Sequence, residues 1–587
     1  MGTSVYYVPG ILYSQSGSRA TLFVAMTLAV FLLLSLKYAE VVWRYPEGGG
    51  VVTVSSSAVH PYAGLLGGLL ILVDYFLTAA LSALSGVLYL AVVFPRLGPA
   101  AIPATAAALA GLCLLNVAGI RESARVSLAF AAAALTTQFA VVVAVAARLG
   151  AEGIAHSFAL VLQGPRLAPG ALVTGYASAF LAFSGLESIS QIAPAMREPR
   201  RRVARRTMTI VVVTIAVTSP LLTLWATTVL GSLDTAQQGQ VVSLLGGYAG
   251  GRALALVVAV SGSLLLVFAS NTAIIGGYHV FVALARMGFL PRLVEKRNRR
   301  RGTPHYAILL AAGVPVAVVF LTGGSQTLLG DLYAFGLLGA FTLTAFSLDV
   351  VRWRERAAGA GPAWWGGYVV GALTTVLVLA AWCTNLFAKP RATLFGGGLT
   401  LAGLAAAGVT TRLARRRGRA AVFPLVHRAN RSLSEIRRTL TGRVQVVVIL
   451  PPDRTLVRAL SEAGARASEG RPVAFLFRGE KKGPSRPARP LEVKDPYLED
   501  AAAQDAFALA ERMTRGLVAD RRYVYVPGSL TGDAVPEIWK VLQPRETLVA
   551  EGDGLLLPDL AIDRVRRTYE DSTPVLHLVT RRLNPPA

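Results

Sequence analysis

The chain has 587 residues, of which 53% are hydrophobic and only 16% charged, and its mean hydropathy is +0.53. Soluble domains carry about 25% charged residues, so this composition excludes an ordinary soluble enzyme and indicates that most of the chain lies in lipid. The net charge of +25 is spread along the chain, which favours topology signals over a nucleic-acid-binding face. The only two cysteines, Cys113 and Cys383, give neither a disulfide framework nor a metal-ligand spacing.

Apolar stretches dominate residues 1–411, which we interpret as a transmembrane domain. A spanning helix needs about 20 apolar residues, and eleven stretches qualify: 20–43, 62–94, 101–118, 124–148, 171–193, 207–231, 252–284, 306–322, 327–351, 364–387 and 392–411. The segment 4–13 is apolar but too short to span, and it contains Pro9-Gly10, a pair that breaks helices. We expect it to be the second half of a first helix whose first half is absent from the chain. The alternative is a short re-entrant or surface segment.

Basic residues in the loops predict the orientation. If the chain starts in the cytoplasm, the inner loops hold twenty Lys and Arg residues and the outer loops seven. This bias is a positive-inside signal, and it predicts a multi-pass protein of the plasma membrane with a cytoplasmic C-terminus.

The pattern changes after residue 411. Residues 412–442 form a basic juxtamembrane linker that anionic lipid would attract. Residues 443–587 alternate strand-like and helix-like segments, which predicts a small α/β domain with a mainly parallel sheet. The expected strands are 444–450, 473–477, 523–526, 547–550 and 575–580, with helices at 454–468 and 499–518 and a loop at 481–498.

Asp74 is one of two acidic residues deep in an apolar stretch. A carboxylate at mid-bilayer depth costs a few kcal/mol and persists where a cation, proton or partner meets it. Helical spacing places Asp74 and Thr78 on one face with Tyr75 beside them. Their oxygens suit a hard cation, although the carboxylate could instead join helices through neighbouring hydroxyls.

Glu187 is the other deep acid and follows Ser184-Gly185. A glycine between serines weakens a helix, and transporters build ion and substrate sites at such breaks. Glu187 could take up a proton there, or it could make a structural hydrogen bond to a neighbouring helix. Ser270, Asn271 and Thr272 offer a possible second ion site, although such residues also hold helices together.

No nucleophile–histidine–acid set is apparent, and we expect neither enzymatic activity nor a bound cofactor. The interruptions near the start and at residues 184–187 lie five spans apart, which is a pointer to an inverted repeat.

Several strings give the chain a family resemblance. They are Arg44-Tyr45-Pro46-Glu47-Gly48-Gly49-Gly50, Val73-Asp74-Tyr75-Phe76-Leu77-Thr78, Phe183-Ser184-Gly185-Leu186-Glu187, Arg197-Glu198-Pro199-Arg200, Ala269-Ser270-Asn271-Thr272, Gly323-Gly324-Ser325-Gln326 and Leu332-Tyr333-Ala334. In these residues the chain resembles the amino acid–polyamine–organocation (APC) superfamily of secondary transporters. The resemblance implies the LeuT-type fold, all-α with a 5+5 inverted repeat, and about twelve spans of which the first is truncated here.

Within the superfamily, the Asp-Tyr pair and the α/β tail resemble the KimA-like branch of KUP potassium importers. The resemblance implies that Tyr7, Asp74, Tyr75, Thr78 and Ser184 surround potassium and that Glu187 couples protons. It also implies a tail similar to universal stress proteins that pairs two protomers into a homodimer.

The sequence departs from that branch in three places. An acidic residue of the branch's first helix would fall before Met1, and Ser184 stands where the branch has threonine. The tail has no match to the glycine pattern of ATP-binding stress proteins, so we do not expect ATP there.

Three functions stay open at this point. The first is import of a small cation, potassium with proton symport, and the second is an amino acid or polyamine permease coupled to a cation that could also be sodium. The first helix begins Gly2-Thr3-Ser4-Val5-Tyr6-Tyr7, which is bulkier than the Gly-x-Gly run with which amino acid members bind a carboxylate. The third function is a membrane sensor that no longer transports.

Overall fold

The computed structural model describes residues 3–45, 50–119, 124–163, 168–183, 185–191, 200–230, 233–298, 301–354, 361–416, 444–478, 501–514, 517–518, 521–526, 544–550 and 575–579. It divides into two compact units, Met1–Thr410 and Thr411–Ala587.

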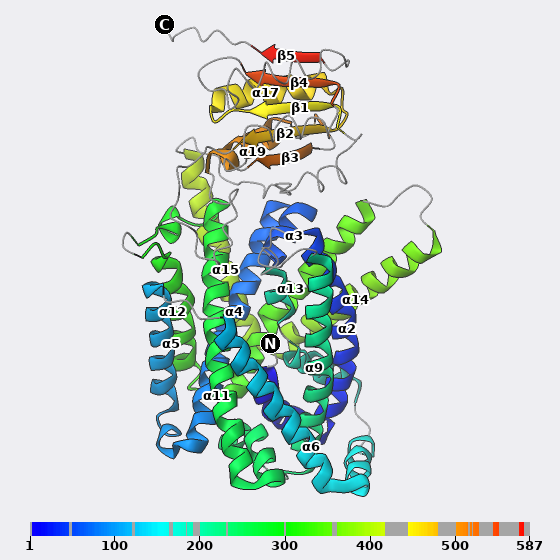
Figure 1. The fold of residues 1–587 in the computed structure, drawn as a ribbon, viewed down its shortest axis with the longest axis vertical. Helices are drawn as coiled ribbons and strands as arrows, with labels where there is room; N and C mark the ends of the chain where they lie inside the picture. The colour runs from blue at the N-terminus through cyan, green and yellow to red at the C-terminus, as the bar shows by residue number, and fades with distance from the viewer. Residues whose placement is uncertain are drawn as a thin grey trace. The chain divides into compact units, whose positions relative to one another are not determined.

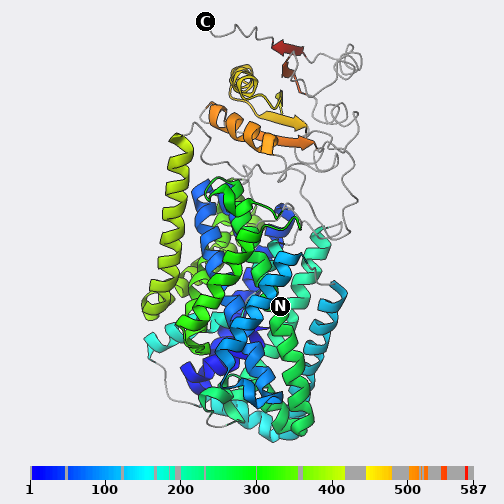
Figure 2. The ribbon, with the colours of Figure 1, turned by 90° about the vertical axis from the view of Figure 1, so that its left-hand side faces the viewer.

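The first unit is a bundle of helices (Figure 1). Its α-helices are α1 Ser4–Ser16, α2 Ala20–Arg44, α3 Gly50–Ala58, α4 Pro61–Val93, α5 Ala101–Ala118, α6 Ala124–Leu162, α7 Pro169–Ala179, α8 Leu186–Gln191, α9 Arg200–Thr228, α10 Thr235–Gln238, α11 Val241–Arg286, α12 His305–Leu321, α13 Gln326–Arg354, α14 Pro362–Ala388 and α15 Pro390–Arg416. Helices α4 and α13 are the most buried, whereas α15 runs along the outside of the bundle (Figure 2).

Nine helical stretches among the described residues are long and apolar enough to cross a membrane, the first combining α1 and α2. Two of the eleven predicted spans do not meet that criterion. The stretch 171–193 is broken into α7 and α8, and α12 has 17 residues. The many apolar helices confirm a polytopic membrane architecture.

Helix α3 was not predicted, because nine residues are too few to signal a span. It forms because Val51 and Val52 bury their side chains against glycines of α4. A Cβ on Gly67 would lie 2.6 Å from the Val51 side chain, so only a glycine allows this contact.

The prediction that Pro9-Gly10 interrupts the first segment is wrong. Helix α1 runs through both residues from Ser4 to Ser16. Gly10 serves packing instead, because a Cβ there would lie 1.9 Å from the carbonyl oxygen of Gln238.

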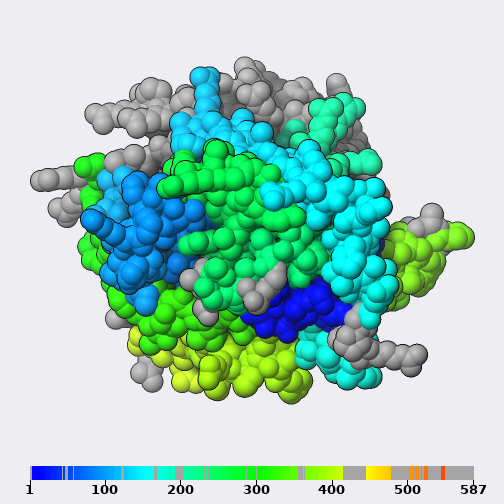
Figure 3. Space-filling model, turned by 90° about the horizontal axis from the view of Figure 1, so that it is seen from below, coloured from blue at the N-terminus to red at the C-terminus, as the bar shows by residue number. Residues whose placement is uncertain are grey.

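Helices α6 and α11 are longer than predicted because each continues beyond a bend. Gly150 (φ 64°) and Gly251 (φ 67°) adopt left-handed φ values, which glycine reaches without strain. Figure 3 shows this end of the bundle, where the dark-blue start of the chain, cyan α6 and green α11 lie beside one another.

The second unit contains a five-stranded parallel sheet of order β3-β2-β1-β4-β5. The strands are β1 Val446–Leu450, β2 Val473–Arg478, β3 Arg521–Val526, β4 Glu546–Ala550 and β5 Val575–Val579. Helix α17 (Arg454–Ala467) packs on β1 and β4, and α19 (Ala501–Thr514) packs on β2 and β3. The helices also contact each other, so they cover the same face.

The predicted strands agree with these bounds to within two residues, and the parallel α/β arrangement is confirmed. Helix α19 ends four residues before the predicted end at 518. The expected loop at 481–498 and most of the linker at 412–442 lie outside the described residues.

Candidate functional site

The stretch 171–193 is a discontinuous helix, as its sequence indicates. Helix α7 tightens into a 3-10 turn at Phe180–Ala182, the chain then passes Gly185 with φ 103°, and α8 begins at Leu186. Ser184 lies outside the described residues. Only a glycine takes up such a φ without strain, so Gly185 is the residue that permits the break.

Glu187 binds the backbone at this break. Its two carboxylate oxygens accept the N–H of Gly185 at 3.0 and 2.9 Å, and one also accepts the Ser188 hydroxyl at 3.3 Å. The side chain therefore satisfies an amide that the interrupted helix leaves free. This structural role differs from the hydrogen bond to a neighbouring helix that the sequence left open, because Glu187 binds its own segment. The same carboxylate also faces the polar cluster described next.

Asp74 lies opposite, on α4, and is fully buried. Both of its carboxylate oxygens are buried without a hydrogen-bond partner among the described residues. The charge of Glu187 acts on the carboxyl, and the Tyr333 phenol of α13 lies within long hydrogen-bonding reach of it. Helix α13 comes close because a glycine faces α4 here: a Cβ on Gly336 would lie 2.6 Å from the Asp74 backbone nitrogen.

Two further tyrosines complete the cluster. The Tyr75 phenol interacts with Glu187, Asp74 and Ser188, and its ring lies on Gly276 of α11, where a Cβ would be 2.7 Å away. Tyr38 of α2 interacts with both acids and donates a 3.3 Å hydrogen bond to the Thr344 hydroxyl. Four helices, α2, α4, α8 and α13, thus contribute to one buried group of carboxyls and phenols.

The structure brings together three predicted site residues, Asp74, Tyr75 and Glu187, and adds Tyr38 and Tyr333. The two tyrosines were missed because tyrosine is common along the chain. The available signal was their position: a phenol within an apolar helix needs a polar partner.

Two of the remaining predicted residues lie on α1 and α4. Tyr7 is buried in α1, and Thr78 is half-buried one turn beyond Asp74. One turn further, the buried Ser82 hydroxyl has no hydrogen-bond partner among the described residues. Helix α1 begins beside the broken helix, because the Ser4 hydroxyl donates to the Ala182 carbonyl at 2.9 Å.

Ser270, Asn271 and Thr272 do not converge. Ser270 donates to the Ala79 carbonyl of α4 at 2.9 Å, and Asn271 accepts from Asn116 of α5 at 2.6 Å. Thr272 is exposed and bonds within its own helix. In this conformation Ser270 and Asn271 join α11 to its neighbours, and the three side chains do not surround one point.

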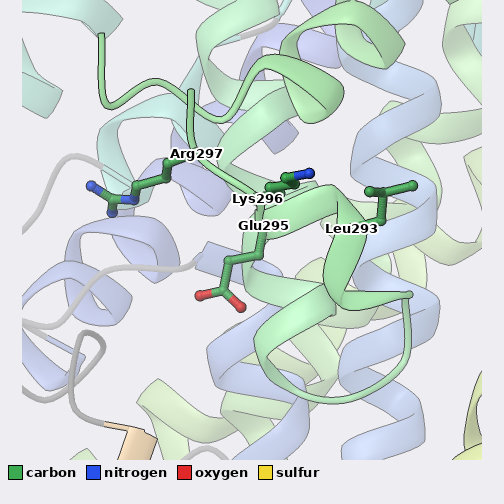
Figure 4. Close-up of a pocket in the computed structure, with 4 residues that line it drawn as sticks. All are labelled: Leu293, Glu295, Lys296 and Arg297. Atoms are coloured by element: carbon green, nitrogen blue, oxygen red, sulfur yellow. The ribbon is translucent and has the colours of Figure 1, made fainter. Parts of the chain in front are cut away.

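An open pocket of about 600 Å³ lies elsewhere, at the loop between α11 and α12 (Figure 4). Its lining residues are Leu293, Glu295, Lys296 and Arg297. It involves none of the predicted site residues. In the part of the chain that the structure describes, no three His, Cys, Asp or Glu residues gather as a metal site would require.

Comparison with known proteins agrees with the membrane architecture. The sequence model of the family described as "Amino acid permease" matches residues 1–400. The potassium transporter KimA of Bacillus subtilis (strain 168) is 28% identical over 360 residues, which are 60% of this chain and 58% of that protein. The chain therefore spans less than two thirds of that relative's length.

Uncharacterized transporters of Mycobacterium bovis and Mycobacterium tuberculosis are 27% identical over 412 residues, 68% of this chain and 86% of theirs. The predicted membership of the APC superfamily is confirmed. The chain belongs to the amino acid permease family and is a multi-pass membrane protein of the transporter class.

Proposed function

We propose that the chain is a secondary active importer of a small cation, potassium taken up together with a proton. The observation that carries the proposal is Asp74, whose fully buried carboxylate has no ion-pair partner and no close hydrogen bond among the described residues, with the Tyr333 phenol at longer reach. A buried carboxylate without a positive partner is costly in a membrane helix. A transported cation would supply the missing partner.

The chemistry around Asp74 suits potassium. Carboxylate, phenol and hydroxyl oxygens are ligands for hard cations, and Asp74, Tyr75 and Tyr333 offer the first two kinds. We assign Tyr7, Thr78, Ser184 and the backbone at Gly185 to the same site. The similarity to a protein named as a potassium transporter supports this assignment.

Glu187 is the proposed proton-coupling group. As a carboxylate it accepts the Gly185 N–H with both oxygens. A neutral carboxyl carries its proton on one oxygen and keeps fewer acceptor sites. Protonation would therefore loosen the contact that holds the break, and would remove a negative charge that acts on Asp74. Binding of a proton and binding of a cation would thus be linked through one structural element.

The finer architecture belongs to the same proposal. The broken helix beside the start of α1 fits a 5+5 inverted repeat, in which the substrate lies between discontinuous helices. The excess of basic residues in the predicted inner loops supports a cytoplasmic second unit. We assign residues 1–411 to transport, 412–442 to a linker at the lipid surface, and 443–587 to a domain similar to universal stress proteins that pairs two protomers. No bound cofactor is needed.

An amino acid or polyamine substrate is the second candidate, because the matching family is described as amino acid permeases. The buried tyrosines at the start of α1 favour the cation, since they are bulkier than the Gly-x-Gly run with which amino acid members bind a carboxylate.

Growth of a potassium-uptake-deficient bacterium at low potassium tests the proposal. We expect the chain to restore growth, Asp74→Asn to abolish the rescue, and Thr272→Val to leave it intact, since Thr272 is exposed and bonds only within its helix. Uptake of labelled amino acids without potassium rescue would support the second candidate. Equal rescue by Asp74→Asn would refute the site.

A further inference from the structure

A second group of charged residues lies outside the candidate site, where α2 and α13 end. Lys37 of α2 is buried, with 3% of its side chain exposed, and its ammonium donates to both Asp349 oxygens at 2.7 and 2.8 Å. It also donates to the Thr375 hydroxyl of α14 at 2.7 Å and to the Ala345 carbonyl at 3.1 Å. Thr375 donates in turn to Asp349 at 2.6 Å. One ammonium thus joins three helices.

A second ionic layer lies one turn further on. Glu40 accepts from Arg44 of its own helix at 2.6 Å and from Arg352 of α13 through both oxygens. Gly371 of α14 faces both layers, because a Cβ there would lie 2.7 Å from the Arg352 guanidinium and 3.2 Å from Asp349. The two layers therefore form one ionic cluster between α2, α13 and α14.

The cluster bridges two groups of helices. Helix α2 packs chiefly against α9, α7 and α8, whereas α13 packs chiefly against α4 and α14. Direct packing of α2 on α13 is slight, and at this end the charged bonds add to a small apolar cluster that includes Val41 of α2 and Leu348 of α13. The candidate cation site lies between the same groups, since Glu187 and Tyr38 come from one, and Asp74 and Tyr333 from the other.

The two sites also share their helices. Tyr38, which acts on both acids of the cation site, follows Lys37 directly. The Tyr38–Thr344 hydrogen bond lies between the cation site and the ionic cluster on α13. A shift of α2 against α13 would therefore change both sites together.

We propose that the Lys37–Asp349–Thr375 cluster is a latch that holds this end of the bundle closed. The inference rests on the proposed transport function, because alternating access requires the two ends to open in turn. On the orientation proposed above this end faces the cytoplasm. Opening would separate Lys37 from Asp349. Stability alone does not require this ion pair, since replacing a buried ion pair by apolar side chains is often neutral or stabilising.

Thiol labelling tests the latch independently of any transported solute. Ser347 of α13 is fully buried beside the cluster and bonds to Ser55 of α3 at 3.0 Å. A Ser347→Cys reporter, in a chain whose native Cys113 and Cys383 are replaced by alanine, reacts with a membrane-impermeant thiol reagent only when this end opens. The full chain is labelled in inside-out vesicles.

We expect Lys37→Met/Asp349→Asn, which removes both charges together, to raise the labelling rate by about fivefold or more, the usual size of a conformational coupling. The matched control is Lys389→Met/Asp331→Asn, since Lys389 and Asp331 form a 2.8 Å pair at the opposite end of α13. That variant should not raise labelling. Thr375→Val, which keeps both charges, should raise the labelling rate by a smaller factor. If the double variant does not fold, the labelling rate of Thr375→Val tests the latch instead.

Labelling that stays unchanged in the folded latch variants, or rises equally in the control, would overturn the latch. If the native chain takes up no potassium, the proposed function is contradicted. The labelling rate would still report whether the cluster holds this end closed.

Discussion

Gly336→Ala is expected to damage the cation site without touching any of its side chains. The added Cβ would lie 2.6 Å from the Asp74 nitrogen and 2.7 Å from the Leu70 carbonyl oxygen, both backbone atoms of α4. Ordinary contact begins at 3.4 Å, so α13 must retreat by about 0.8 Å. Overpacking of this kind costs about 1–3 kcal/mol, and the retreat carries Tyr333 away from Asp74.

Thermal unfolding and rubidium uptake of the purified chain measure the two effects. We expect a lower unfolding temperature and a rise in the apparent KM for the cation of about tenfold, the equivalent of roughly 1.4 kcal/mol of lost binding. Gly313→Ala on α12 is the control, because nothing lies within 4 Å of its added Cβ. If both variants unfold and transport alike, the close contact of α4 and α13 does not position the site.

Three more predictions follow from single contacts. Gly185→Ala should lower the stability of the chain by about 1–2 kcal/mol, since φ 103° is unfavourable for an L-residue. The same substitution should reduce cation uptake. Gly170→Ala in α7 is the control, because nothing lies within 4 Å of its added Cβ. Lys37→Met alone should destabilise by about 3–5 kcal/mol because it strands the buried Asp349 carboxylate, and adding Asp349→Asn should recover most of that loss in thermal unfolding. In the second unit, burial, followed by the nearby Glu511, raises the pKa of Tyr523 well above its ordinary value. Folding therefore favours the neutral phenol. The contribution of Tyr523 to the free energy of unfolding is complete below the unfolded pKa of about 10 and is lost as the pH rises further. Tyr523→Phe should therefore reduce the loss of stability at alkaline pH.

Local patterns in the sequence predicted much of the fold. Alternating apolar strands and amphipathic helices located the parallel sheet of the second unit to within two residues at each strand. Gly185, between Ser184 and Ser188, indicated the broken helix, because a glycine weakens a helix and nearby serines can satisfy the freed backbone groups. Asp74 was identified because a lone acid in an apolar run is costly.

The errors arise where tertiary packing decides. Pro9 and Gly10 stay within α1 because neighbouring helices hold the segment in place. Lys37 was counted as a topology signal near a helix end, and its pairing with Asp349, 312 residues away, has no local signature. Tyr38 and Tyr333 likewise join the site only through the packing of α2 and α13 around α4 and α8.

Rubidium uptake into proteoliposomes containing the purified full-length chain tests the central claim most directly. With an inward proton gradient, the native chain should accumulate the ion to saturation, potassium should compete with it, and Asp74→Asn should reduce the flux to that of empty vesicles. Undiminished flux through Asp74→Asn, or no flux through the native chain, would contradict the claim that Asp74 is the centre of a cation transport site.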